Sequence, residues 1–447
     1  MNSGRLPPGP RRPPLAQTWW WLRDPLGFLE AMAARYGHGT PFTMRRVGGM
    51  RLVMVSDPVH VREVFQRHEV FLAGEAQKAI RTFLGPNSLI GIDGVQHKRH
   101  RRLLLPPFHG ERMRAYGELM REVALSDAEG WPRGRPFRLL GPFTRITLDI
   151  IFRAVFGVHD GATRERLRRL LHELTGTGRA ELAYLPFLQR DLGPWSPWGR
   201  FLRQQREFEE ILTDAVRAAR RAPEGREDIL ARLVVEGQRH ADPLGDDELR
   251  DELRTLLVAG HETTTAALCW TLQWVLGLPE LRREVVAEVR AASPGGRFDP
   301  ARIGELKLLD ACLKEGLRLH PPIPSIGRFV AREAELAGYL LPRGSYVCPV
   351  PHLTHRTPEL YPDPLRFDPG RFLGAERRSP FEYYPFGGGI RLCVGTNFAR
   401  YEMLVVLASL LARYDLELVG APTLAGRRKA LLVVPRTGTP VRVRERR

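Results

Sequence analysis

The stretch that decides the fold is Pro385-Phe386-Gly387-Gly388-Gly389-Ile390-Arg391-Leu392-Cys393-Val394-Gly395. Three consecutive glycines form a loop whose backbone can approach a flat ligand closely. The pattern over 396–414 predicts a helix, so Cys393 lies just before a helix N-terminus, where free N–H groups and the helix dipole stabilise a thiolate. An anionic sulfur beside an arginine is what a thiolate–iron bond needs. The alternative for the cysteine taken alone is an inert buried thiol beside a turn.

The same stretch resembles the haem-binding signature of the cytochrome P450 family, whose fixed positions are filled here by Phe386, Gly389, Arg391, Cys393 and Gly395. The resemblance implies a mainly α fold with small β-sheets, in which haem b lies between a long central helix and the helix after the cysteine loop. It also implies that Cys393 is the proximal iron ligand, and a thiolate ligand favours O–O cleavage. The loop residues expected to contact the cofactor are Phe386, Gly387, Arg391, Cys393 and Gly395.

A second motif lies in the longest periodic segment, 246–276, which predicts a helix that crosses the core. Its middle reads Ala259-Gly260-His261-Glu262-Thr263-Thr264. Glycine inside a helix costs about 1 kcal/mol relative to alanine, and close approach of a ligand is one reason to keep it. The Thr263 hydroxyl can bond to a carbonyl of the preceding turn, and Glu262 can relay protons. The alternative is two polar residues on a solvated face, which the apolar run around them disfavours.

By resemblance, Glu262 and Thr263 are the oxygen-activating acid–alcohol pair of the family, and Ala259 and Gly260 border the haem. His261-Glu262 also begins a His-Glu-x-x-His zinc motif, but a threonine at position 265 excludes that site.

A third motif is the pair Glu315 and Arg318, which stand at i,i+3 on one face of a helix predicted over 302–319. An exposed pair of this kind contributes about 0–1 kcal/mol. Together with Arg371, the pair resembles the structural ion network of the family. Gly370 stands where the family often has an acidic residue.

Haem propionates require cations, and the segment 93–102 resembles the family helix that carries a Trp- or His-x-x-x-Arg pair. His97 and Arg101 fill those two positions, while Arg328 and Arg391 match two further propionate partners. For any one of these arginines, the alternative is a solvated surface charge in an arginine-rich chain.

A hydrophobic pocket is expected from family position around the segment 80–89, the turn at Ala259 and the segment 324–326. The expected lining residues are Phe83, Leu84, Leu89, Ala259, Thr263, Pro324 and Ile326. Their apolar character favours a guest such as a fatty acid, terpenoid, steroid or polyketide. The segment 182–198, with Tyr184, Phe187, Trp195 and Trp198, is expected to form an entrance lid; ordinary helix and loop packing is the alternative.

The remaining pattern is mainly helical from residue 24 onward. A hairpin is expected over 41–55 with its turn at Gly48-Gly49, and Asp57 is expected to cap a helix over 57–69. Further helices are expected near 28–36, 110–130, 143–157, 162–182, 200–220, 226–237 and 279–291, with strands near 328–331, 335–340, 346–349 and 432–443. The Pro-rich residues 1–18 are expected to be a disordered or loosely packed lead before a single catalytic domain over 19–447.

Composition narrows the class of protein. Hydrophobic residues make up 43% and charged residues 27% of the 447, as in ordinary globular chains. No run of about 18 apolar residues is present, so no membrane anchor is expected. The net charge of +17 comes almost wholly from arginine, a bias that genome composition can produce, and no nucleic-acid-binding motif accompanies it. Four cysteines without zinc spacing favour a reducing cytoplasm.

These observations identify the chain as resembling soluble bacterial P450 monooxygenases. Such an enzyme inserts one oxygen atom from O2 into a hydrophobic small molecule. It is expected to be a monomer that receives electrons from a separate ferredoxin or flavodoxin with its reductase, docked on a basic face that contains the segment 98–102 and the residues around Arg391 and Arg400. Two alternatives remain open: a peroxide-using haem-thiolate enzyme, which the pair Glu262-Thr263 disfavours, and a non-catalytic haem sensor or carrier.

Overall fold

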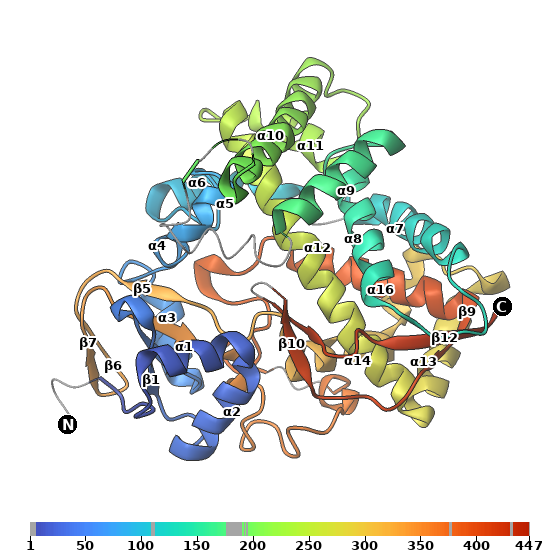
Figure 1. The fold of residues 1–447 in the computed structure, drawn as a ribbon. Helices are drawn as coiled ribbons and strands as arrows, with labels where there is room; N and C mark the ends of the chain where they lie inside the picture. Colours follow the sequence, from blue (N-terminus) through green and yellow to red (C-terminus); the bar gives the residue numbers. More distant parts are fainter. Residues whose placement is uncertain are drawn as a thin grey trace.

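The computed structural model describes residues 6–108, 112–175, 190–191, 193, 195–374, 378–429 and 432–446. Figure 1 shows a body of broadly triangular outline, with one group of strands near the N-terminus, another near the C-terminus and helices over most of the remainder. Its helices are α1 (Pro14–Arg23), α2 (Pro25–Tyr36), α3 (Pro58–Gln66), α4 (Ala73–Ala76), α5 (Arg81–Leu84), α6 (Gly94–Leu104), α7 (Arg112–Glu129), α8 (Leu140–Ala154), α9 (Gly161–Thr175), α10 (Pro197–Arg221), α11 (Ile229–Gly237), α12 (Asp246–Gly277), α13 (Pro279–Ala291), α14 (Lys307–Leu319), α15 (Pro351–Thr354) and α16 (Thr396–Arg413).

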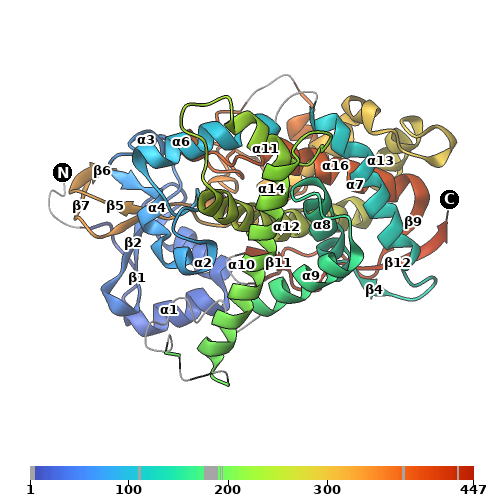
Figure 2. The same cartoon turned by 90° about the horizontal axis from the view of Figure 1, so that it is seen from above.

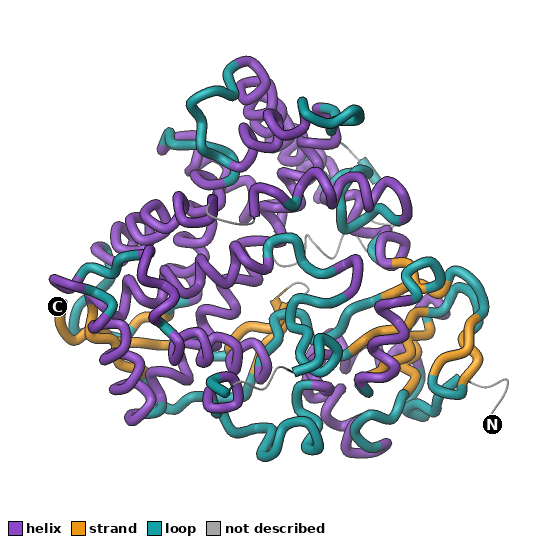
Figure 3. The backbone as a smooth tube through the Cα atoms, turned by 180° about the vertical axis from the view of Figure 1, so that it is seen from behind, coloured by secondary structure: helices purple, strands orange, loops and turns teal. Residues whose placement is uncertain are grey.

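The strands form small sheets, as expected. Figure 3, seen from behind, shows strands near each chain end and further strands in the middle of the molecule. The larger sheet has the order β1-β2-β8-β5-β3, a second has the order β4-β12-β9, and β6-β7 and β10-β11 are separate hairpins. The strands are β1 (Phe42–Arg45), β2 (Arg51–Val55), β3 (Phe71–Leu72), β4 (Phe137–Arg138), β5 (Arg328–Val330), β6 (Ala334–Leu336), β7 (Tyr339–Leu341), β8 (Tyr346–Pro349), β9 (Tyr414–Leu418), β10 (Gly426–Lys429), β11 (Leu432–Pro435) and β12 (Pro440–Arg446).

Local chemistry explains the first elements. The predicted hairpin is confirmed, with Phe42 opposite Met54 and both turn glycines at positive φ, Gly48 at 78° and Gly49 at 75°. The predicted cap of α3 is also confirmed, because an Asp57 carboxylate oxygen accepts the N–H of Val59 at 2.7 Å.

Helix α12 runs through the middle of the molecule and contacts α8, α10, α14, α16 and β11. The prediction of one long helix over 246–276 is confirmed by the observed bounds Asp246–Gly277. Acidic residues fill its first turn, where they complement the positive end of the helix dipole, and Glu248 Oε2 accepts the N–H of Gly245 at 2.9 Å.

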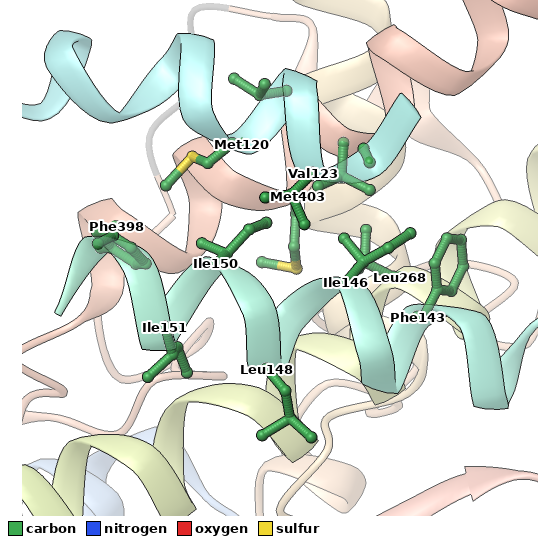
Figure 4. Close-up of a cluster of buried hydrophobic side chains, with 14 of the residues drawn as sticks. Met120, Val123, Phe143, Ile146, Leu148, Ile150, Ile151, Leu268, Phe398 and Met403 are labelled. Atoms are coloured by element: carbon green, nitrogen blue, oxygen red, sulfur yellow. The ribbon is translucent and has the colours of Figure 1, made fainter. Parts of the chain in front are cut away.

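The largest apolar cluster joins α7, α8, α12 and α16. In Figure 4, Met120 of α7 and Ile146 of α8 belong to one group of side chains between the helices, together with Leu268 of α12 and Met403 of α16. These four side chains are buried, so the helix that carries the second motif and the helix after the cysteine loop are fixed on one core.

Helix α14 begins later than predicted. Residues Pro300–Glu305 form a separate 3-10 turn, and the α-helix starts at Lys307. The reason is a tertiary contact: the Glu288 carboxylate of α13 accepts the N–H groups of Leu308 at 2.7 Å and Leu309 at 2.9 Å and so caps the helix.

The N-terminal segment corrects the expectation of a loose lead. Thr43 donates its backbone N–H to Pro8 O at 2.8 Å and its hydroxyl to Pro7 O at 2.7 Å. The expectation is wrong for residues 6–18, because prolines without N–H groups still offer carbonyl acceptors to a neighbouring strand. Helix α1 also crosses residue 18, and the division into 1–18 and 19–447 stays a prediction. Among the described residues, no helix is both long and apolar enough to span a bilayer.

Candidate functional site

The cysteine loop is fixed by its own backbone and by α3. Cys393 N donates to Phe386 O at 3.0 Å, and Gly387 and Gly389 have φ of 75° and 63°. A Cβ on Gly388 would lie 2.5 Å from the Phe65 ring, and one on Gly389 would lie 2.7 Å from Phe65 O. Close packing by the protein itself therefore requires two of the three glycines, which the sequence pattern could not reveal.

Cys393 is the exposed member of the four free cysteines, although protein atoms crowd its sulfur. Burial raises the pKa of the thiol, while the N–H of Gly395, the hydroxyl of Thr396 and the charge of Arg101 act in the opposite direction. The donors expected at the helix N-terminus are present, but by themselves they do not outweigh burial. A thiolate here needs a further positive centre, such as an iron ion.

The four predicted propionate partners converge beside the loop. Arg391 and Arg101 both lie close enough to His97 to help burial lower its pKa to about 3, so the imidazole is neutral. Arg391 likewise adds to burial in lowering the pKa of Arg328 to about 10. Arg101 donates to Leu392 O at 2.6 Å, which ties α6 to the cysteine loop.

The side chains around these four predicted propionate partners do not carry enough negative charge to balance the arginines. Asp93 pairs with Arg391, whereas Arg328 is buried with a hydrogen bond to Gly327 O. His97 Nδ1 is buried and has no hydrogen-bond partner within the described part of the chain. The residues therefore fit an anionic group that the surrounding side chains do not supply.

The middle of α12 presents an accessible turn. Ala259 is exposed although most of the helix around it is buried. Thr263 Oγ1 donates to Ala259 O at 2.7 Å, which is the backbone bond expected from the sequence. Gly260 has a different explanation from ligand approach, since a Cβ there would lie 2.8 Å from Ile151 Cδ1 of α8. Its contact with a cofactor stays a prediction.

Glu262 has a partner that sequence reasoning missed. Lys429 of β10 places its Nζ 3.0 Å from Glu262 Oε1, and the two side chains are about one third and one eighth exposed. The only signal in the sequence is that Lys429 is one of five lysines among 68 basic residues. The pairing itself arises from the fold, which brings β10 over the middle of α12.

The predicted ion network forms. Arg318 Nε lies 2.6 Å from Glu315 Oε2, and both side chains are fully buried. Arg371 Nε lies 3.5 Å from Glu315 Oε1, and the N–H of Asp368 donates to the same oxygen at 2.8 Å. Arg318 also donates to the carbonyls of His355, Pro364 and Arg366. The exposed-pair alternative is therefore excluded.

The predicted pocket residues differ in how far they are exposed to solvent. Leu84, Leu89 and Pro324 are buried by protein, whereas Ala259 is exposed. Phe83, Thr263 and Ile326 are half-buried, and Phe83 lines a small pocket with Phe201, Phe208, Leu171 and Val258. Sequence reasoning passed over Ile323, which is 42% exposed between two buried prolines.

Most of the segment expected to form the lid, 182–198, lies outside the described residues. Tyr184 and Phe187 lie outside the described residues. Trp198 is buried and stacks on Phe201 with ring centroids 5.0 Å apart, whereas Trp195 is 89% exposed.

Comparison with known proteins decides the class. The family model described as Cytochrome P450 matches residues 7–439. The chain belongs to the cytochrome P450 family. The cofactor of this family is protoporphyrin IX haem, and the protein is a P450 monooxygenase. The exposed residue Cys393, the convergent cations and the buried His97 nitrogen, which lacks a partner among the described residues, fit that anionic cofactor.

Relatives and solved structures agree over nearly full length. The P450 is 37% identical over 452 residues to a putative cytochrome P450 135B1 of Mycobacterium tuberculosis (strain H37Rv), covering 100% of this chain and 93% of that protein. It is 34% identical to a putative cytochrome P450 138 of Mycobacterium bovis, covering 99% and 97%. A solved structure of a retinoic-acid-bound cyanobacterial CYP120A1 has a TM-score of 0.84 at 26% sequence identity and covers 99% of each chain. The structure of the cytochrome P450DA heme domain has a TM-score of 0.86 at 25% identity and covers 99% of this chain and 98% of that chain.

Proposed function

We propose that this P450 inserts one oxygen atom from O2 into an apolar small molecule bound over the accessible turn of α12. The observation that carries the proposal is the exposure of Ala259 in a helix that is otherwise mostly buried, with Thr263 one turn away. When bound, haem supplies the chemistry of dioxygen reduction and oxygen insertion. The chain supplies the shape of the site, its charges and its protons.

Each group of residues has a separate role in this proposal. Cys393 ligates the iron, and His97, Arg101, Arg328 and Arg391 hold the propionates. Glu262 moves protons from the protein surface to the accessible turn, and the Thr263 hydroxyl directs them. Lys429 holds the Glu262 carboxylate at the outer end of that route, as the 3.0 Å contact supports.

The substrate class rests on the apolar lining. Phe83 with Phe201 and Phe208, and Ile323 beyond α14, offer hydrocarbon surface. A fatty acid, terpenoid, steroid or polyketide fits such a lining. The cyanobacterial CYP120A1 is bound to retinoic acid, a largely apolar isoprenoid, and this supports the same class of guest here.

Electrons are proposed to come from a separate acidic ferredoxin or flavodoxin, delivered to a monomer in the cytoplasm. Lys98 and Arg102 of α6 are exposed and form no ion pair among the described residues. Arg99 and Arg400, which the sequence also favoured for docking, are instead paired with Glu248 and Asp310. The docking cations are therefore Lys98 and Arg102.

The test is a screen for substrate-induced spin-state shifts with a library of lipids and terpenoids, followed by product analysis of each hit. We expect an apolar hit to give an oxygenated product that requires both O2 and an electron donor. Turnover with hydrogen peroxide alone would favour the peroxide-using alternative. Binding of O2 without any product from the hits would favour the sensor.

The ligand assignment is tested separately. We expect the reduced protein with carbon monoxide to show the red-shifted band of thiolate ligation, and Cys393→His to abolish it. A substitution at another cysteine, such as Cys348→His, is unsuitable as a control because that thiol is buried. Cys393→Ser, which also removes the Cys393 thiol, therefore serves as the second variant. A thiolate band that survives in both variants would exclude Cys393 as the ligand.

A further inference from the structure

Helix α1 has its polar side inward and its apolar side outward. Gln17 and Thr18 are buried, with 1% and 6% of their surface exposed. Leu15, Trp19 and Leu22 are 71%, 60% and 45% exposed. Their i, i+4, i+7 spacing places them on one stripe of the helix, roughly 10 Å long at about 1.5 Å per residue. We call these three residues the α1 face.

The buried polar side chains fix this orientation. Gln17 Nε2 donates to Pro10 O at 3.1 Å and Arg12 O at 2.7 Å, and its Oε1 accepts the N–H of Arg45 at 2.9 Å. Thr18 Oγ1 accepts the N–H of Val47 at 3.1 Å. Rotation of α1 to bury the apolar stripe would break these bonds and leave buried polar groups unpaired, so the α1 face stays outward.

The charge around the α1 face has one sign. Residues 1–23 contain four arginines and no acidic residue. Arg11, Arg12 and Arg23 are exposed, and Arg23 lies over the Trp19 ring at 5.4 Å. The first acids along the chain are engaged elsewhere: Asp24 caps α2, and Glu30 pairs with Arg356. A partner that is both apolar and anionic fits this surface.

We propose that the α1 face binds the surface of an anionic lipid bilayer, with Leu15, Trp19 and Leu22 in the acyl boundary and the arginines at the headgroups. Tryptophan flanked by arginine is the side-chain pattern of the membrane interface. A second copy of the chain is a poorer occupant, because three side chains fall far short of the roughly 800 Å² per partner that a stable dimer buries.

A second exposed aromatic residue lies on the same side of the molecule. Trp195 is 89% exposed and stands two residues before α10. Figure 2 shows α1 and the N-terminal end of α10 along the same edge of the body, while α6 lies along the opposite edge. Trp195 therefore adds a further exposed aromatic side chain toward the edge of the body that α1 occupies.

The test is flotation of the full-length, haem-loaded protein with vesicles of phosphatidylglycerol and phosphatidylcholine, compared with phosphatidylcholine alone. We expect binding to the anionic vesicles that weakens as NaCl is raised. The variant Leu15→Ser/Trp19→Ser should lower the partition coefficient roughly tenfold or more, because it removes buried apolar area. Arg11→Glu/Arg12→Glu should weaken binding to anionic vesicles and leave the neutral ones unchanged.

Three controls separate the proposal from loss of fold or self-association. Trp19→Phe should keep binding while it lowers quenching of tryptophan fluorescence by brominated lipid. Val95→Ser, which removes an 85% exposed valine from α6, should leave the partition unchanged. All variants should keep the carbon monoxide spectrum of the parent. Equal partition of the Leu15→Ser/Trp19→Ser variant would overturn the proposal, and so would sedimentation showing a dimer that this variant abolishes.

Discussion

The ion network and the turn of α12 are held in opposite ways. Arg318 is fully buried and bonds to one carboxylate and three carbonyls. Thr263 is half-exposed, and its hydroxyl donates to a carbonyl of the turn before it. A region with many buried bonds resists change until it fails as a unit, whereas an accessible turn can change its chemistry without loss of fold. The ion network therefore governs whether the folded site forms, whereas the accessible turn of α12 governs the chemistry at that site.

The largest effect is expected at the ion network. Glu315→Ala or Arg318→Ala should lower the free energy of unfolding by about 3–5 kcal/mol, because the remaining charge is buried without its partner. Little soluble, haem-loaded protein should be recovered, as measured by haem content and thermal unfolding. Glu280→Ala is the matched control, since Glu280 and Arg283 have the same i,i+3 spacing but are each 77% exposed. Similar yields for all three variants would contradict the expected difference between the buried and the exposed ion pair.

The next effect is expected in the cysteine loop. Gly389→Ala forces a side chain into positive φ and against Phe65 O, so unfolding free energy should fall by about 2–4 kcal/mol. Gly49→Ala isolates backbone strain, because Gly49 has φ 75° with no atom within 4 Å of the added Cβ, and should cost about 1 kcal/mol. Denaturant unfolding measures both. Equal costs would mean that contact with α3 adds nothing.

Local spacing allowed much of the site to be predicted. The cysteine loop, the pair Glu315 and Arg318 and the bond from Thr263 to its preceding turn all depend on residues close in sequence, and they appear as expected. The contacts that were missed join distant segments. Phe65 against the glycines, Lys429 against Glu262 and the cap on α14 from Glu288 follow from tertiary packing that no local pattern encodes.

At the accessible turn of α12, Thr263→Ala should leave haem content and stability nearly unchanged. It should lower the coupling between electron consumption and product formation. We expect about tenfold more hydrogen peroxide per product, because the hydroxyl that directs protons is lost. Thr264→Ala is the matched control: its hydroxyl makes the same 2.7 Å bond to Gly260 O, but the side chain is buried. Peroxide and product are measured against electron consumption. A Thr264 variant as uncoupled as the Thr263 variant would refute a specific role.

A smaller effect is expected from Lys429. Lys429→Met removes the partner of Glu262 and should change the rate of product formation about threefold, consistent with a partly exposed ion pair. The solvent deuterium isotope effect on that rate should change with it, and a purely structural role would not move that quantity. Lys429→Arg should restore both values. If Lys429→Met left the solvent deuterium isotope effect unchanged, Lys429 would have no role in the proton route.

The smallest effect is expected on the outer surface of α6, where charge acts without burial. Lys98→Glu and Arg102→Glu should each slow reduction by an acidic ferredoxin about twofold at low salt, and the difference should disappear as ionic strength rises. Neither change touches Arg101, whose bond to Leu392 O would confound the result. Arg35→Glu on α2 makes the same change in net charge elsewhere and should leave the rate unaltered. Stopped-flow reduction measures all three. If Arg35→Glu slowed reduction as much as Lys98→Glu, overall charge rather than a docking face would govern the encounter, and the arginine excess would reflect composition alone.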